Sequence, residues 1–155
     1  MAKGQLIIDT NLLLLLIIGG IEDGRHIKNS NRLNKFNIQD YDNIVAVMEQ
    51  YDCICITPYI ATEVSNLIDL NGYVSDLAYE IARNLFSIFH QVDSDINKDC
   101  GTENFLTYGI TDNSLIKLAP KYIILTDDTR LLTPLFAANP NNILPYAAVK
   151  AAISN

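Results

Sequence analysis

The chain of 155 residues contains no tryptophan, and only 7 glycines and 5 prolines. So few glycines and prolines exclude a collagen-like or low-complexity protein. The three cysteines are an odd number and too few for a disulfide framework, which favours a reducing compartment, the cytoplasm, as the location. The length is close to that of one ordinary domain, so we expect residues 1–155 to form a single domain.

The sequence also lacks an apolar run long enough to cross a membrane. The longest such run, Leu12–Ile18, has seven residues, whereas a membrane-spanning helix needs about 20. Polar residues stand directly before the run, and no small-residue cleavage site follows the Gly19-Gly20 pair. We therefore expect neither a signal peptide nor a membrane anchor.

Positive charge is scarce, because 11 Lys and Arg residues face 18 Asp and Glu residues, for a net charge of −7. This balance excludes a protein that wraps DNA or RNA on a generally basic surface. It does not exclude a nuclease whose acidic residues are gathered around metal ions. Apolar residues make up 49% of the chain, which is the composition of a globular protein.

Short apolar segments alternate with segments of helical periodicity. Strands are expected at residues 5–9, 53–57, 122–126 and 143–146, and residues 91–103 contain an edge strand or a loop. Helices are expected at residues 11–18, 38–50, 58–69, 73–90, 111–119 and 128–136. This alternation predicts an α/β fold with a central, mostly parallel sheet of four to five short strands flanked by helices. In such folds the ligand lies beyond the carboxyl ends of the strands.

Four acidic residues stand out by their position in this pattern. Asp9 ends the first strand, Glu63 lies in the helix after the second strand, Asp112 opens a later helix, and Asp128 follows the strand at 122–126. Each aspartate taken alone is more simply a helix cap, and Glu63 a solvated acid. Four carboxylates that converged on one crevice would instead repel one another without a counter-ion.

This set of residues resembles the PIN-domain nuclease family. The shared features are Ile8-Asp9-Thr10-Asn11, a glutamate on the helix after the second strand, Thr111-Asp112, and a strand that leads into Thr126-Asp127-Asp128; they extend over about residues 5–146. The resemblance implies a PIN-like three-layer fold and a metal-dependent endonuclease that acts on single-stranded RNA. Small stand-alone members of this family are often toxins paired with an antitoxin protein, so an antitoxin partner is also expected.

The resemblance also implies roles for individual residues. Asp9, Asp112 and Asp128 would bind Mg²⁺ or Mn²⁺, and Glu63 would bind the metal or orient the attacking water. Asn11 and Thr126 would hold the acids or a phosphate by hydrogen bonds, while Asp127 fills the variable position of its motif. Independently of the family, these ions prefer hard oxygen ligands, and they activate water for phosphodiester hydrolysis.

The densest group of basic residues lies between the first strand and the second helix. It comprises Arg25, His26, Lys28, Arg32 and Lys35, and we interpret it as a surface that contacts RNA phosphates. Arg130 is the next candidate, because it follows Asp128 closely. The simpler interpretation is a solvated polar segment.

Several alternatives remain open from the sequence. The same acids would serve a nuclease that acts on DNA or on a structured flap, and a PIN-like fold without activity would serve as a binding or assembly module. The segment Leu12–Leu16 is apolar on all sides of its helix, which indicates burial in the core or in a partner interface; a homodimer is therefore expected. Cys53 and Cys55 are interpreted as small buried residues, because no second pair of ligands completes a zinc site.

Overall fold

The computed structural model describes residues 4–154. One parallel sheet lies at its centre, with the strand order β3-β2-β1-β4-β5. The strands are β1 (Gln5–Ile8), β2 (Cys53–Ile56), β3 (His90–Gln91), β4 (Ile123–Thr126) and β5 (Ile143–Pro145). The predicted α/β fold with a parallel sheet is confirmed.

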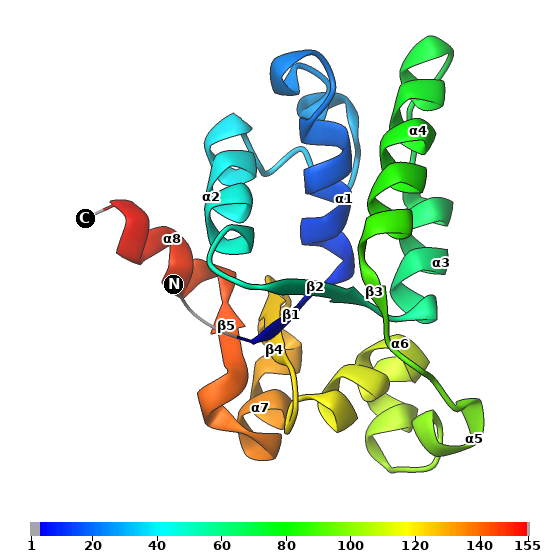
Figure 1. The fold of residues 1–155 in the computed structure, drawn as a ribbon, viewed down its shortest axis with the longest axis vertical. Helices are drawn as coiled ribbons and strands as arrows, with labels where there is room; N and C mark the ends of the chain where they lie inside the picture. Colours follow the sequence, from blue (N-terminus) through cyan, green and yellow to red (C-terminus); the bar gives the residue numbers. More distant parts are fainter. Residues whose placement is uncertain (1–3, 155) are drawn as a thin grey trace.

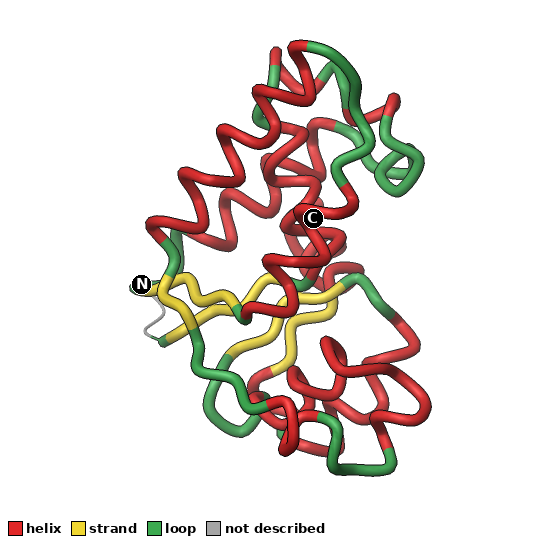
Figure 2. Tube along the Cα trace, turned by 90° about the vertical axis from the view of Figure 1, so that its right-hand side faces the viewer, coloured by secondary structure: helices red, strands yellow, loops and turns green. Residues whose placement is uncertain are grey.

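Helices cover both faces of this sheet (Figures 1 and 2). One layer consists of α1 (Thr10–Gly19), α2 (Ile38–Met48), α3 (Pro58–Leu67) and α4 (Tyr73–Ile88). The opposite layer consists of α5 (Ile96–Asp99), α6 (Asn104–Leu118) and α7 (Thr129–Ala138), and α8 (Tyr146–Ser154) lies beside β5 and α2. Short 3-10 helices occur at Glu22–Gly24, Ile27–Asn29 and Pro140–Asn142. The result is three layers, as expected.

Helix α1 forms the centre of the core. Its apolar residues Leu12–Ile18 are all buried, because the sheet lies beneath the helix and α2, α3 and α4 pack around it. Asp9 caps its first turn and Gly20 its last. Burial inside its own chain accounts for the apolar surface on every side, so this helix no longer gives a reason to expect a homodimer.

The order of the strands places a switch point next to β1. The chain adds β2 and β3 on one side of β1, and then β4 and β5 on the other side. In open parallel sheets the ligand crevice lies at such a point, beyond the carboxyl ends of the strands. Asp9 directly follows β1, and Asp127 and Asp128 directly follow β4. The Asp9 amide still donates to the Leu125 carbonyl, at 2.9 Å, which fixes the two strand ends side by side.

Two details differ from the sequence-based expectation. The helix expected at residues 111–119 begins earlier, at Asn104, and is interrupted at Gly109, whose φ of +82° is accessible to glycine at little cost. Asp112 therefore lies in the first turn after this break rather than at the start of the helix.

None of the helices within residues 4–154 combines the length and apolar character that a bilayer crossing requires.

Candidate functional site

A polar pocket of about 290 Å³ opens at the carboxyl ends of β1 and β4, and we call it the acidic pocket. All four acids singled out in the sequence line it, each from a different segment: Asp9 before α1, Glu63 on α3, Asp112 on α6 and Asp128 before α7. The remaining lining residues are also polar: Thr10, Asn11, Arg32, Lys35, Asp127 and Thr129. The fold thus brings together residues that are up to about 120 positions apart in the chain.

Asp9 is the most deeply placed of these acids, with only 5% of its surface exposed. Its Oδ1 atom accepts a hydrogen bond from the Thr10 amide, at 2.7 Å, and its Oδ2 atom accepts one from the Thr126 hydroxyl, at 2.6 Å. Burial raises the pKa of Asp9 to about 6, with help from the nearby Asp127 and Asp128 carboxylates and against these two hydrogen bonds. Asp9 is therefore both a helix cap and a pocket residue.

Glu63 connects three helices around the pocket. Its Oε1 atom accepts a hydrogen bond from the Thr10 hydroxyl of α1, at 3.3 Å, and its Oε2 atom accepts one from the Thr111 hydroxyl of α6. These contacts exclude the simpler interpretation of Glu63 as a solvated helix acid.

Asp112 is surrounded by like charges. Its pKa is raised to about 7, chiefly by burial and then by the carboxylates of Asp9, Asp128 and Glu63, while Arg130 acts in the opposite direction. Carboxylates that interact across a small cavity disfavour full ionisation unless a cation is near. The pocket therefore has an excess of negative charge.

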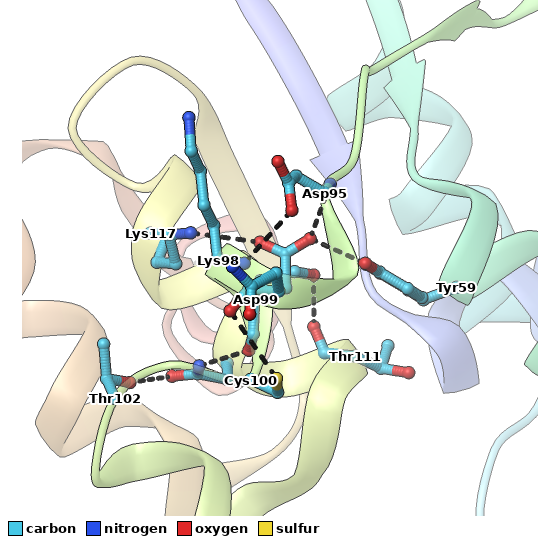
Figure 3. Close-up of polar contacts among 11 residues, drawn as sticks. Tyr59, Asp95, Lys98, Asp99, Cys100, Thr102, Thr111 and Lys117 are labelled. Carbon is cyan, nitrogen blue, oxygen red and sulfur yellow. Dashed lines mark hydrogen bonds and ion pairs between the residues drawn. The ribbon is translucent and has the colours of Figure 1, made fainter.

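The residues on both sides of Asp112 are fixed by a polar cluster under α6 (Figure 3). At its centre, the Asp99 carboxylate lies between Tyr59, whose hydroxyl donates to it at 2.7 Å, and Lys117, whose Nζ atom lies 3.3 Å away. The buried Asn113 side chain donates to the Asp99 carbonyl and accepts a hydrogen bond from the Thr102 hydroxyl. Since Thr111 is held by Glu63 and Asn113 by Asp99, the backbone of Asp112 is constrained from both sides.

Two cations from the predicted basic segment lie at the acidic pocket. Arg32 donates from Nε to the Asn11 Oδ1 atom at 3.2 Å, and the Lys35 ammonium lies 3.1 Å from Asp127 Oδ2. These contacts place the segment across the mouth of the pocket and give Asn11 a role different from holding an acid.

The other basic residues singled out in the sequence do not line the acidic pocket in the described part of the chain. The imidazole of His26 instead faces Glu22, with 3.5 Å between Nε2 and Oε2, and Lys28 is exposed. The Arg130 guanidinium lies over the Tyr108 ring, 5.3 Å from its centroid. The proposed phosphate contact of the segment is thus narrowed to Arg32 and Lys35.

The acidic pocket offers carboxylates but, within the described part of the chain, no compact set of metal ligands. Among residues 4–154, no three His, Cys, Asp or Glu side chains are grouped closely enough to hold a metal ion. The carboxylates of Asp9, Glu63 and Asp128 each accept hydrogen bonds from groups of their own chain. The chemistry of the set nevertheless fits Mg²⁺ or Mn²⁺, because it offers only hard oxygen donors and carries uncompensated negative charge.

The chain matches no protein-family model, and a search of curated proteins finds no match either. The resemblance to PIN-domain nucleases therefore remains a prediction that rests on the four acids and their order along the chain.

Sequence reasoning missed the two threonines and the supporting cluster. Thr10 and Thr111 each stand directly beside a predicted acid in the chain, so their position was a signal for second contacts to the acids. Asn113 and Asp99 gave no such signal, because their bond joins α5 to α6 through a backbone carbonyl.

Proposed function

We propose that this protein is a Mg²⁺- or Mn²⁺-dependent endoribonuclease that hydrolyses phosphodiester bonds of single-stranded RNA in the cytoplasm. The observation that carries the proposal is the acidic pocket itself. Five carboxylates from four separate segments line it at the switch point of a parallel sheet, where such folds bind their ligands.

The two cations at the mouth of the pocket support a polyanionic substrate. An acidic protein with a net charge of −7 needs local positive charge to approach RNA. Arg32 and Lys35 supply it directly beside the carboxylates. A phosphodiester held by these side chains would have its phosphorus next to Asp9, Asp112 and Asp128.

The acids would act by holding a divalent ion in the acidic pocket. Such an ion polarises the phosphoryl oxygen and lowers the pKa of water. Asp9, fixed by Thr10 and Thr126, would provide a rigid oxygen donor, and the Asp112 and Asp128 carboxylates, which line the same pocket, would provide others. Glu63, fixed by two threonine hydroxyls, would orient the attacking water by accepting its hydrogen bond.

A second candidate function is a binding or assembly module without catalysis. It is favoured by the finding that no three potential ligands are grouped closely enough for a metal among the described residues. On this alternative the acidic pocket would bind a cationic group of a partner protein.

Cleavage of a labelled single-stranded RNA with Mn²⁺, Mg²⁺ or EDTA would test the proposal, with single-stranded DNA of the same sequence alongside. We expect metal-dependent RNA cleavage that Asp9→Asn and Asp112→Asn each reduce at least about 100-fold. Asp42→Asn is the matched control, because Asp42 is an exposed acid on α2 outside the pocket; its cleavage rate should equal that of the wild type.

Calorimetry with Mn²⁺ on the same variants separates the two candidates. Metal binding that is lost in Asp112→Asn, together with cleavage, supports the nuclease. Cleavage that persists in EDTA would contradict the metal-dependent mechanism. If a folded wild-type protein neither binds metal nor cleaves RNA, the binding module is favoured. If it cleaves DNA but not RNA, the protein is a nuclease that acts on DNA.

A further inference from the structure

A second cavity, of about 260 Å³, opens beside the acidic pocket. The two share three lining residues, Lys35, Asp127 and Thr129, so they are adjoining parts of one surface depression. A flexible ligand seated in the acidic pocket would reach this cavity without passing through protein. We call it the aromatic pocket; the strand β5 and the helices α7 and α8 form most of it.

The aromatic pocket differs from the acidic pocket in the chemistry of its wall. Its apolar lining consists of Phe36, Leu132, Pro145, Tyr146 and Ala147, which stand beside the polar residues Thr126, Asp127 and Thr129 and two lysines. The rings of Phe36 and Tyr146 meet edge to face, with their centroids 6.2 Å apart and their planes at 68°. The Tyr146 hydroxyl donates to Asp40 at 2.6 Å, so it is engaged with the interior. The pocket therefore offers apolar surface for a flat ring.

Two ammonium groups stand at the rim of this apolar wall. The Lys35 Nζ atom lies 5.0 Å from the centroid of the Phe36 ring, and the side chain is 59% exposed. Lys150, whose side chain is 53% exposed, lies 3.2 Å from Asp40 Oδ1. An apolar wall with cations at its rim suits a ligand that combines a flat ring with negative charge.

A nucleotide unit is such a ligand. Its base has two apolar faces that stack or pack on aromatic and aliphatic side chains, and its phosphate is anionic. A cavity of about 260 Å³ is below the usual range of pockets for drug-sized ligands, about 300–1,000 Å³, and so fits one ring system. Lys35 belongs to both pockets and would lie between the base and the phosphate.

We propose that the aromatic pocket binds the base of the nucleotide next to the phosphodiester held in the acidic pocket. The inference rests on the proposed function, because it assigns the neighbouring part of the same RNA strand to a second site. It predicts that the rate of cleavage depends on the base at that one position of the strand.

Ala147 allows the pocket to be filled without removing a core residue. It is exposed, lies in the first turn of α8 and lines the aromatic pocket. Ala147→Trp would place an indole where the base would lie. Ala148→Trp is the matched control, because Ala148 is the next residue of the same helix, is also exposed and does not line the pocket.

The first measurement is a titration of the full chain with uridine 5′-monophosphate and, separately, with adenosine 5′-monophosphate. Binding is monitored through the NMR chemical shifts of the assigned backbone amides. We expect shifts at Phe36, Leu132 and Ala147, with a dissociation constant of about 1 mM for one of the two nucleotides. Ala147→Trp should weaken this binding roughly tenfold or more, by the usual loss for one stacked base. Ala148→Trp should bind like the wild type.

The second measurement is kcat/KM for RNA substrates that differ in one base beside the cleaved bond. Nucleotide shifts at the aromatic pocket that Ala147→Trp abolishes, without RNA cleavage by the wild type, would support the pocket and overturn the proposed function. RNA cleavage that Ala147→Trp and Ala148→Trp leave equal, with no shifts at the pocket at about 10 mM nucleotide, would overturn the pocket and leave the nuclease intact. Absence of both would overturn both.

Discussion

Asp9 and Asp40 are both almost inaccessible carboxylates, with 5% and 1% of their surfaces exposed, but their surroundings are opposite. Asp40 lies in the first turn of α2 and contacts α8. It accepts hydrogen bonds from the Tyr146 hydroxyl at 2.6 Å and the Asn37 amide at 2.9 Å, and its Oδ1 atom lies 3.2 Å from the Lys150 ammonium. Burial acts to raise the pKa of Asp40, but these donors outweigh burial, and the pKa is lowered. The fold satisfies this charge completely.

Asp9 has two hydrogen-bond donors as well, yet its pKa is raised to about 6. Burial is the largest cause acting on the pKa at both residues. At Asp9 it outweighs the two donors, and the Asp127 and Asp128 carboxylates add to it, whereas at Asp40 the hydrogen bonds and the Lys150 charge outweigh it. Burial alone therefore does not distinguish a structural acid from a functional one. A buried carboxylate paired with donors stabilises the fold, whereas carboxylates that outnumber the cations around them, as in the acidic pocket, favour the binding of an additional positive charge.

The largest change in stability is expected from replacing Asp40, whose charge is fully paired. Asp40→Asn removes the charge that faces Lys150 and weakens the bond from Tyr146, so the free energy of unfolding should fall by about 2–4 kcal/mol. Urea unfolding followed by circular dichroism measures this change. The folded fraction should cleave RNA at the wild-type rate, because Asp40 does not line the acidic pocket.

Asp42→Asn, in the same helix but exposed, is the control and should change stability by less than about 0.5 kcal/mol. If Asp40→Asn is as stable as this control, the contacts of Asp40 do not stabilise the fold. The contrast drawn between Asp40 and Asp9 would then be wrong.

Asp9→Asn should have the opposite effect on stability. Without divalent ions at pH 8, the free energy of unfolding of the variant should exceed that of the wild type by about 1–2 kcal/mol. The variant should therefore unfold at a higher urea concentration. The shift from 3.8 to about 6 corresponds to about 3 kcal/mol, and imperfect replacement of the hydrogen bonds from Thr10 and Thr126 offsets part of this gain.

The pH dependence provides a separate check on Asp9. Because the folded protein binds the Asp9 proton more tightly than the unfolded chain, this residue lowers stability as pH rises from about 4 to about 6. Above that interval its contribution is constant. The wild type without metal should therefore lose stability over this interval relative to Asp9→Asn. Parallel curves for the two proteins would contradict the environment assigned to Asp9.

The sheet and the four acids could be predicted because they depend on local signals. Apolar runs such as Leu6-Ile7-Ile8 are typical of buried parallel strands, and an acid directly after such a run lies at the edge where strands end. Asp9, Glu63, Asp112 and Asp128 all line the acidic pocket, and their role as a metal site stays a prediction.

The rest depends on contacts between distant segments, which one sequence does not encode locally. The bond between Asn113 and the Asp99 carbonyl, and the approach of Lys35 to Asp127 across 92 positions, follow only from packing. The basic segment shows the same limit. Its charge follows from its composition, but no local pattern separates Lys35 and Arg32 from Lys28 and His26.

Lys35 lines both the acidic pocket and the aromatic pocket. Its replacement should have the smallest effect on stability. Lys35→Met breaks an exposed ion pair with Asp127, which changes the free energy of unfolding by less than about 1 kcal/mol. RNA binding responds more clearly, since the loss of one phosphate contact reduces the slope of log affinity against log salt by about 0.7 for a single strand. Fluorescence anisotropy of labelled RNA at several NaCl concentrations, with EDTA present to prevent cleavage, measures that slope.

Lys28→Met is the control from the same segment, because Lys28 is exposed and does not line the acidic pocket. Its slope should equal that of the wild type. Equal slopes for both variants would place the phosphate contact elsewhere, and a larger change for Lys28→Met would restore the broad basic surface inferred from the sequence alone.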